Sequence, residues 1–341
     1  MLSKLKNYLY NKVYINIVQS SKDTQIYVEE IHHNGSSDNY EEVFNSSDKS
    51  DIYDYIKTFM NRSPINYISL LDPSLSQGAA PTCSSSEMKK YCDIGGLEHV
   101  CVDETWVYYT SKLDLLQIQG RYKKTGIDFI FSPFYMLHKF FADKIKEEIA
   151  LFILVHEDYI ALSVFENSKL LFASLLDMQK DDESNDELLM DVDDDEELIL
   201  DEIENNSVDL EDIDVDDDLE GLDELDDLDD LDTFDDMDDF EADEDDEEQL
   251  SFSNKQIDDS VEQNSFGEDY HRFSLIQSAV NTFYKDSKFD SEFIQDIYVA
   301  DGIGLSTEFK KFLEEEIFLS VFIRKIDIPQ ELCELAKVEQ K

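Results

Sequence analysis

The feature that most limits how this chain can fold is an acidic segment in its second half. Residues 181–250 contain 40 Asp and Glu and no Lys or Arg. Neighbouring carboxylates in an extended chain lie about 3.5 Å apart, well within the screening length of about 8 Å at physiological salt, so they repel one another. Ordering such a segment would also cost about 1–2 kcal/mol per residue in backbone entropy. The composition therefore predicts a disordered acidic insertion, which we place at residues 179–269.

Within this segment, large apolar residues recur at every third position. Because a step of three residues slips by about 60° on an α-helix, they form a spiral and not one continuous face. Alternation of acidic and apolar residues is typical of segments that dock onto a partner, and a solvating spacer of low complexity would show the same pattern. The residues that would contact a partner are Leu222, Leu225, Leu228, Leu231, Phe234, Met237 and Phe240.

Outside the acidic segment, the chain has the composition of an ordinary globular protein. The other 271 residues carry 42 of the 82 acidic residues against 28 Lys and Arg, and they suffice for one large domain or two lobes. The net charge of −54 disfavours nucleic acid as a partner, because phosphates would meet like charge. No apolar run approaches the roughly 18–20 residues of a membrane helix, so we expect a cytoplasmic protein.

The cysteines and histidines show no spacing typical of a metal or redox site. Cys83, Cys92 and Cys101 lie nine residues apart, and Cys333 lies far along the chain. We therefore expect four reduced thiols, as in most cytosolic proteins. The six histidines include no pair with metal-ligand spacing, and no Gly-x-Ser-x-Gly nucleophile motif is present. The sequence thus predicts neither a catalytic residue nor a metal site.

Hydrophobic periodicity predicts a similar series of elements twice. The first series has strands at 13–18 and 25–31, a polar loop at 34–50, a helix at 51–60, a strand at 65–71, a strand at 100–109 and a helix at 133–148. The second has strands at 150–155, 159–165 and 169–175, a helix at 273–284, a strand at 293–300, a helix from Ser306 to 317 and a strand at 318–326. This duplication indicates an α/β protein with one lobe at 1–148 and a second at 149–178 and 270–341.

The order of these elements resembles the actin-like ATPase superfamily, and within it the PilM and GspL-type proteins of type IV pilus and type II secretion machines. The stretch from Gln295 to Leu305 is similar to that family's adenosine-side motif, in which a strand enters a Gly-rich turn and a helix. The stretch from Ala161 to Phe172 is similar to the hairpin of the second phosphate loop. The resemblance implies a duplicated, ribonuclease H-like two-lobe fold, with Gly302 and Gly304 as the cofactor-binding residues.

The chain departs from this family where phosphate and metal would bind. Actin-like ATPases carry an Asp-x-Gly sequence in each hairpin, but the corresponding stretches here are Asn16-Ile17-Val18 and Leu154-Val155-His156. Both carboxylates and both glycines are missing, and Asn cannot hold Mg²⁺ by charge. Asp301, beside the two remaining glycines, would repel a phosphate. We therefore expect a catalytically inactive domain without a cofactor, with ATP that is held but not hydrolysed as an alternative.

The resemblance implies a scaffold on the cytoplasmic face of the inner membrane. PilM-like proteins bind the short tail of a PilN-like single-span protein beneath a type IV pilus, a secretion system or a flagellar motor with PilMNO-like parts. The chain would then also bind itself in a ring, and the acidic insertion would reach a basic protein. Two alternatives stay open: an active ATPase of the same machine, and an acidic chaperone or mimic that sequesters basic proteins through residues 181–250.

A small basic patch at Arg121, Lys123 and Lys124 precedes one predicted strand. It would suit a membrane surface or the acidic insertion. In a protein this acidic, however, two or three neighbouring cations are usually a solvated turn, and we assign no function to them on the sequence alone.

Overall fold

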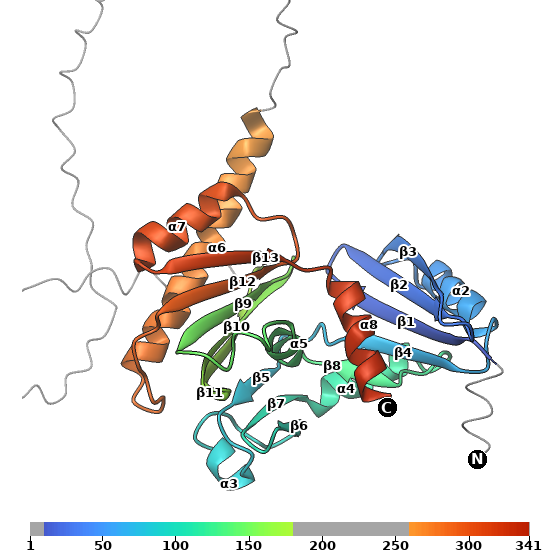
Figure 1. Ribbon diagram of the computed structural model, residues 1–341, viewed down its shortest axis with the longest axis horizontal. Helices are drawn as coiled ribbons and strands as arrows, with labels where there is room; N and C mark the ends of the chain where they lie inside the picture. The colour runs from blue at the N-terminus through green and yellow to red at the C-terminus, as the bar shows by residue number, and fades with distance from the viewer. Residues whose placement is uncertain (1–9, 180–258, 341) are drawn as a thin grey trace, which may run out of the picture. The chain divides into compact units, whose positions relative to one another are not determined.

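The computed structural model describes residues 10–179 and 259–340, which contain two five-stranded sheets and one small sheet (Figure 1). The first large sheet has the order β3-β2-β1-β4-β8, with β1 (Lys12–Gln19), β2 (Asp23–Ile31), β3 (Ser37–Asn45), β4 (Asn66–Leu71) and β8 (Phe129–Phe131). The second has the order β11-β10-β9-β12-β13, with β9 (Ala150–Val155), β10 (Tyr159–Glu166), β11 (Lys169–Asp177), β12 (Asp296–Asp301) and β13 (Ser320–Lys325).

The two large sheets repeat one topology. In each sheet the first three strands form an antiparallel meander, and the fourth and fifth strands run parallel to the first. The strand order across each sheet is therefore third, second, first, fourth and fifth. This repeat confirms the predicted fold class, a duplicated two-lobe α/β fold of the actin-like type.

Helices cover both faces of the large sheets. The outer face of the first sheet carries α2 (Lys49–Met60) and α4 (Lys112–Arg121), and that of the second carries α6 (Asp259–Lys285) and α7 (Thr307–Ile317). The central strands are buried on both faces because their apolar residues point both ways: Val13 and Ile15 of β1 point to the outer core, and Tyr14 and Val18 to the inner one. No helix in the described ranges is long and apolar enough to cross a bilayer.

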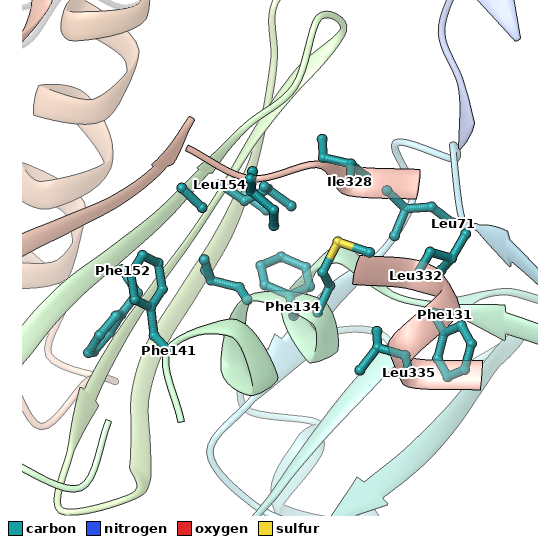
Figure 2. Close-up of a cluster of buried hydrophobic side chains, with 14 of the residues drawn as sticks. Leu71, Phe131, Phe134, Phe141, Phe152, Leu154, Ile328, Leu332 and Leu335 are labelled. Carbon is teal, nitrogen blue, oxygen red and sulfur yellow. The ribbon is translucent and has the colours of Figure 1, made fainter. Parts of the chain in front are cut away.

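The last helix of each half packs on the sheet of the other half. α5 (Pro133–Phe140) follows the fifth strand of the first sheet but packs on β9 and β10, whereas α8 (Ile328–Glu339) follows β13 and packs on β1, β2 and β4. Phe134 of α5, Leu154 of β9 and Leu332 of α8 belong to the core that results (Figure 2). The range 270–341, which we predicted as part of the second lobe, therefore ends in a helix that packs on the first.

A small third sheet lies between β4 and β8 in the chain. It has the order β5-β7-β6, with β5 (Gly78–Ala80), β6 (Leu97–Val102) and β7 (Trp106–Ser111), and it is accompanied by α3 (Ser85–Met88). A disulfide joins Cys83 to Cys101, so the expectation of four reduced thiols is wrong for this pair. The separation of 18 residues between the two cysteines does not by itself predict a disulfide. The pair forms because the fold places Cys101 on β6 next to Cys83 in the loop after β5. Cys92 and Cys333 are free.

Four other predictions differ from the structure. The predicted loop 34–50 contains β3, whose mostly exposed side chains show no apolar alternation. The predicted strand 100–109 is the β6–β7 hairpin, which turns at Asp103 and Glu104 with positive φ. The predicted helix 133–148 ends at Phe140. α6 begins at Asp259, inside the range 179–269 predicted as disordered, and the rest of that range beyond residue 179, with its apolar repeat, lies outside the described residues.

Candidate functional site

The two hairpin turns that would face the phosphates in an active member of the superfamily are bonded to each other. Ser21 lies in the β1–β2 turn, and Asp158 lies in the β9–β10 turn. The Asp158 carboxylate accepts one hydrogen bond from the backbone N–H of Ser21 and another from its hydroxyl, both at 2.6 Å. Backbone N–H groups in such turns are the groups that bind phosphate. The backbone N–H of Ser21 is therefore already bonded to a carboxylate of the chain itself.

A second carboxylate fills the Gly-rich turn after β12. Asp301 is buried, and its carboxylate accepts hydrogen bonds from the backbone N–H groups of Ile303, Gly304 and Leu305 at 2.7–3.1 Å. Successive N–H groups that converge in this way suit an anion. Here the anion is Asp301, so these three donors are already paired.

The two glycines predicted to bind a cofactor lie in this turn, and each has a structural explanation. A Cβ atom at Gly302 would lie 2.8 Å from the carbonyl oxygen of Val155 and 2.6 Å from Cδ1 of Ile328. Gly304 has a φ of +85°, which side-chain-bearing residues rarely adopt. The geometry of the turn therefore accounts for both glycines without a ligand.

We expect Gly302→Ala to lower the free energy of unfolding by about 2 kcal/mol, because the added methyl group meets a backbone oxygen as well as a side chain. The matched control is Gly120→Ala in α4, where an added Cβ has no neighbouring atom within 4 Å. There, alanine should stabilise the helix by up to about 1 kcal/mol. Urea unfolding of both variants measures the difference, and equal effects would contradict the close packing at Gly302.

A cavity of about 310 Å³ lies among the two hairpin turns, the Gly-rich turn and the start of α8. The described residues that line it include the carboxylates of Asp23, Glu41, Glu157 and Asp327 and no Lys or Arg. Four carboxylates, with no cation beside them among the described residues, oppose the entry of a polyphosphate, because like charges repel over a screening length of about 8 Å. This cavity suits nucleotide poorly.

The residues at the family's carboxylate positions have internal partners. The buried Asn16 side chain donates to the carbonyl oxygen of Tyr27 at 3.1 Å and accepts from the Ser69 hydroxyl at 2.6 Å. Leu154 lies in the apolar core, and burial lowers the pKa of His156, so this imidazole is neutral at pH 7. Among the described residues, no group of three or more His, Cys, Asp or Glu is placed to hold a metal ion.

A second cavity, of about 430 Å³, lies between two strand edges. β6 is an edge of the small sheet, β8 is an edge of the first large sheet, and residues of both line the cavity. Aromatic side chains form much of its wall, and Val100 on β6 is 50% exposed. We call this cavity the edge groove; it is lined by residues 100–103, Tyr108, 128–131, Tyr135, Lys139 and Glu339.

The edge groove has the chemistry of a site for an extended peptide. A strand at the edge of a sheet presents backbone N–H and C=O groups that an added strand can pair with. Among the described residues, the charged side chains around the groove are those of Asp103, Asp128 and Glu339, against one cation, Lys139. This balance favours a peptide that carries Lys or Arg.

Sequence reasoning missed the edge groove because it depends on which strands become edges. The run Phe129-Ile130-Phe131 before Ser132 and Pro133 was the one usable signal: a short apolar strand followed by a helix N-cap and a proline in the first turn. Nothing in the sequence indicates that β6 and β8 face a common cavity.

Comparison with known proteins identifies families without an assigned activity. Residues 151–341, more than half of the chain, match the family described as domain of unknown function DUF8341. Residues 10–138 match a second family, domain of unknown function DUF8569. A comparison with curated proteins found no match.

Several solved structures are similar in fold. A Bacteroides thetaiotaomicron protein with an actin-like ATPase fold and unknown function is 11% identical, with a TM-score of 0.47 over 99% of both chains. A chain of the PilM–PilN type IV pilus biogenesis complex is 8% identical, with a TM-score of 0.49 over 95% of this chain and 94% of that one. Component A of the Acidaminococcus fermentans (R)-2-hydroxyglutaryl-CoA dehydratase is 8% identical, with a TM-score of 0.35 over 95% of each. The fold assignment rests on the duplicated strand order and not on these likenesses.

Proposed function

The chain belongs to the family described as domain of unknown function DUF8341, and for this member we propose the role of a non-catalytic scaffold that holds the cytoplasmic tail of a PilN-like inner-membrane protein. The edge groove carries the proposal, because it combines two strand edges, aromatic walls and an acidic rim. The scaffold would serve an envelope-spanning machine, which is a type IV pilus, a type II secretion system or a flagellar motor.

The tail would bind as an added strand. β6 has six residues and β8 has three, so the groove matches a peptide strand of about five residues. Since successive side chains of a strand point to opposite faces, alternate apolar residues of the tail would contact Tyr108, Phe131 and Tyr135. A Lys or Arg in the tail would lie near Asp103, Asp128 or Glu339. The expected tail is thus a short extended segment with alternate apolar residues and a cation.

Under this proposal the protein does not hydrolyse ATP. Asp158 and Asp301 hold backbone N–H groups that phosphate would need, and the cavity beside them is lined, within the described ranges, by four carboxylates and no cation. We expect calorimetric titration of the full chain with MgATP to give a Kd above about 1 mM, which corresponds to a free energy weaker than about −4 kcal/mol. Micromolar binding, or release of phosphate above the buffer rate, would instead support an ATPase.

Val100→Lys is expected to weaken binding of the tail at least about tenfold, a loss of about 1.4 kcal/mol. The substitution removes an apolar side chain from the groove and adds a charge that repels a cationic tail. Val43→Lys is the matched control, because Val43 is 52% exposed on β3, the edge of the first large sheet opposite β8. Fluorescence anisotropy with a labelled tail peptide measures both. An equal loss in the two variants would rule out the edge groove as the site.

A further inference from the structure

We infer that the outer surface of α4 is a docking site for an anionic lipid bilayer, independently of the tail-binding proposal. Leu113 and Leu116 of α4 are 70% and 63% exposed. The segment from Lys112 to Lys124 supplies four cations, Lys112, Arg121, Lys123 and Lys124. We call these two leucines and four cations the α4 surface.

The leucines of the α4 surface form an apolar patch. Leu113 and Leu116 are three residues apart and therefore neighbours on the helix, on the side away from the buried Ile118. A third exposed leucine, Leu75, lies in the loop after β4, next to Ser76, which donates a hydrogen bond to Asp114 of α4. Two adjacent exposed leucines, with a third in a loop bonded to the same helix, are more than the scattered single apolar residues that are normal on a surface, and this indicates an interaction site.

The α4 surface is positively charged although the chain as a whole is strongly acidic. Residues 112–124 carry four cations and one acid, a net charge of +3, whereas the whole chain carries −54. Lys112 lies 3.3 Å from Glu98. Within the described part of the chain, no ion pair engages Arg121, Lys123 or Lys124. Arg121 donates a hydrogen bond to Gln19, and the Lys124 ammonium lies over the Tyr53 ring, but neither partner neutralises the charge. The positive charges therefore remain to attract lipid phosphates.

A cavity of about 900 Å³ opens beside α4, toward α2 and the β1–β2 turn. Arg121, Lys123 and Lys124 line it together with Lys49 and several serine hydroxyls. Its two carboxylates, on Asp114 and Asp158, already accept hydrogen bonds from Ser76 and Ser21. Ammonium, guanidinium and hydroxyl donors around one hollow suit the phosphate of a lipid headgroup.

The net charge of the protein does not prevent this docking. Charges act over about 8 Å at physiological salt, so a bilayer responds mainly to the charges on the surface that touches it. Lys and Arg near an anionic leaflet attract it, and exposed leucines enter the boundary between headgroups and acyl chains. A soluble phosphate, or an acidic peptide without apolar residues, would explain the cations but would leave Leu113 and Leu116 exposed to water. The pairing of apolar and cationic side chains therefore favours a bilayer.

Flotation of the full chain with vesicles tests this inference. We expect binding to phosphatidylcholine vesicles that contain phosphatidylglycerol, no binding to phosphatidylcholine alone, and release at high salt. The double variant Lys123→Gln/Lys124→Gln should lower the partition coefficient about 30-fold, since each basic residue contributes about 1 kcal/mol at an anionic surface. Leu113→Ser/Leu116→Ser should lower it at least about tenfold.

The control variants remove lysines or an exposed apolar side chain at positions outside the α4 surface. Lys310→Gln/Lys311→Gln removes two adjacent exposed lysines from α7, and Phe318→Ser removes an apolar side chain that is 86% exposed. Both should float as the wild type does. Failure of the wild type to bind the anionic vesicles, equal binding to neutral vesicles, or equal losses in the controls would each overturn the inference. No partner tail is present in this assay, so the result does not depend on the edge groove.

Discussion

Phe134→Ala is expected to lower the free energy of unfolding by about 4 kcal/mol. Phe134 is fully buried in the core that α5 and α8 share, among residues that include Leu154 and Leu332 (Figure 2). Removing the ring leaves a cavity that these neighbours cannot fill without moving α5 relative to α8. Denaturant unfolding followed by circular dichroism measures the loss.

Phe293→Ala is the matched control for this prediction. Phe293 is 74% exposed, so its loss should change the free energy of unfolding by less than about 0.5 kcal/mol. If Phe134→Ala cost no more than this control, the two lobes would not be joined by one core.

Lys337→Met is expected to lower the free energy of unfolding by about 3 kcal/mol. Lys337 of α8 lies 2.5 Å from the Glu29 carboxylate of β2 and 2.6 Å from that of Glu334. The Glu29 side chain is only 11% exposed, so removing the cation leaves a charge with little access to water. The substitution keeps most of the side-chain volume. The decrease in the free energy of unfolding therefore measures how much the ion pair stabilises the packing of α8 on the first sheet.

A double-mutant cycle isolates this ion pair. Glu29→Gln/Lys337→Met should recover most of the loss, because no buried charge remains. Burial disfavours the charged form of Lys337, but hydrogen bonds to Glu29 and Glu334 outweigh it and raise its pKa above 10.5. A raised pKa means that the stabilisation is complete below pH 10.5 and is lost at higher pH. A double variant as unstable as Lys337→Met would show that the contact of Lys337 with Glu29 is not the cause.

The hairpins and capped helices were predictable because their signals are local. Strands β1, β2, β9, β10 and β11 alternate with short polar turns, and Ser306 was expected to cap α7. The structure shows the Ser306 hydroxyl accepting a hydrogen bond from the N–H of Phe309. α8 carried a comparable signal that we did not use: Asp327 as the N-cap, Pro329 in the first turn, and apolar residues at Ile328, Leu332 and Leu335.

The candidate sites were less predictable because they depend on tertiary contacts. Ser21 and Asp158 are 137 residues apart, and no periodicity links them. The resemblance indicated Gly302 and Gly304, but Val155 and Ile328, which surround Gly302, come from other elements. Exposed leucines on α4 could not be distinguished from core leucines on the sequence alone, because the helix also has a buried face.

The central claim is that the edge groove holds the tail of a membrane protein. Site-specific photocrosslinking in native membranes tests it most directly, with the photoreactive residue at position 100 in the groove or at position 43 on β3. We expect position 100 to crosslink to the tail of a single-span membrane protein and position 43 not to do so. Crosslinks from position 100 only to basic soluble proteins, or the same crosslinks from both positions, would contradict the claim.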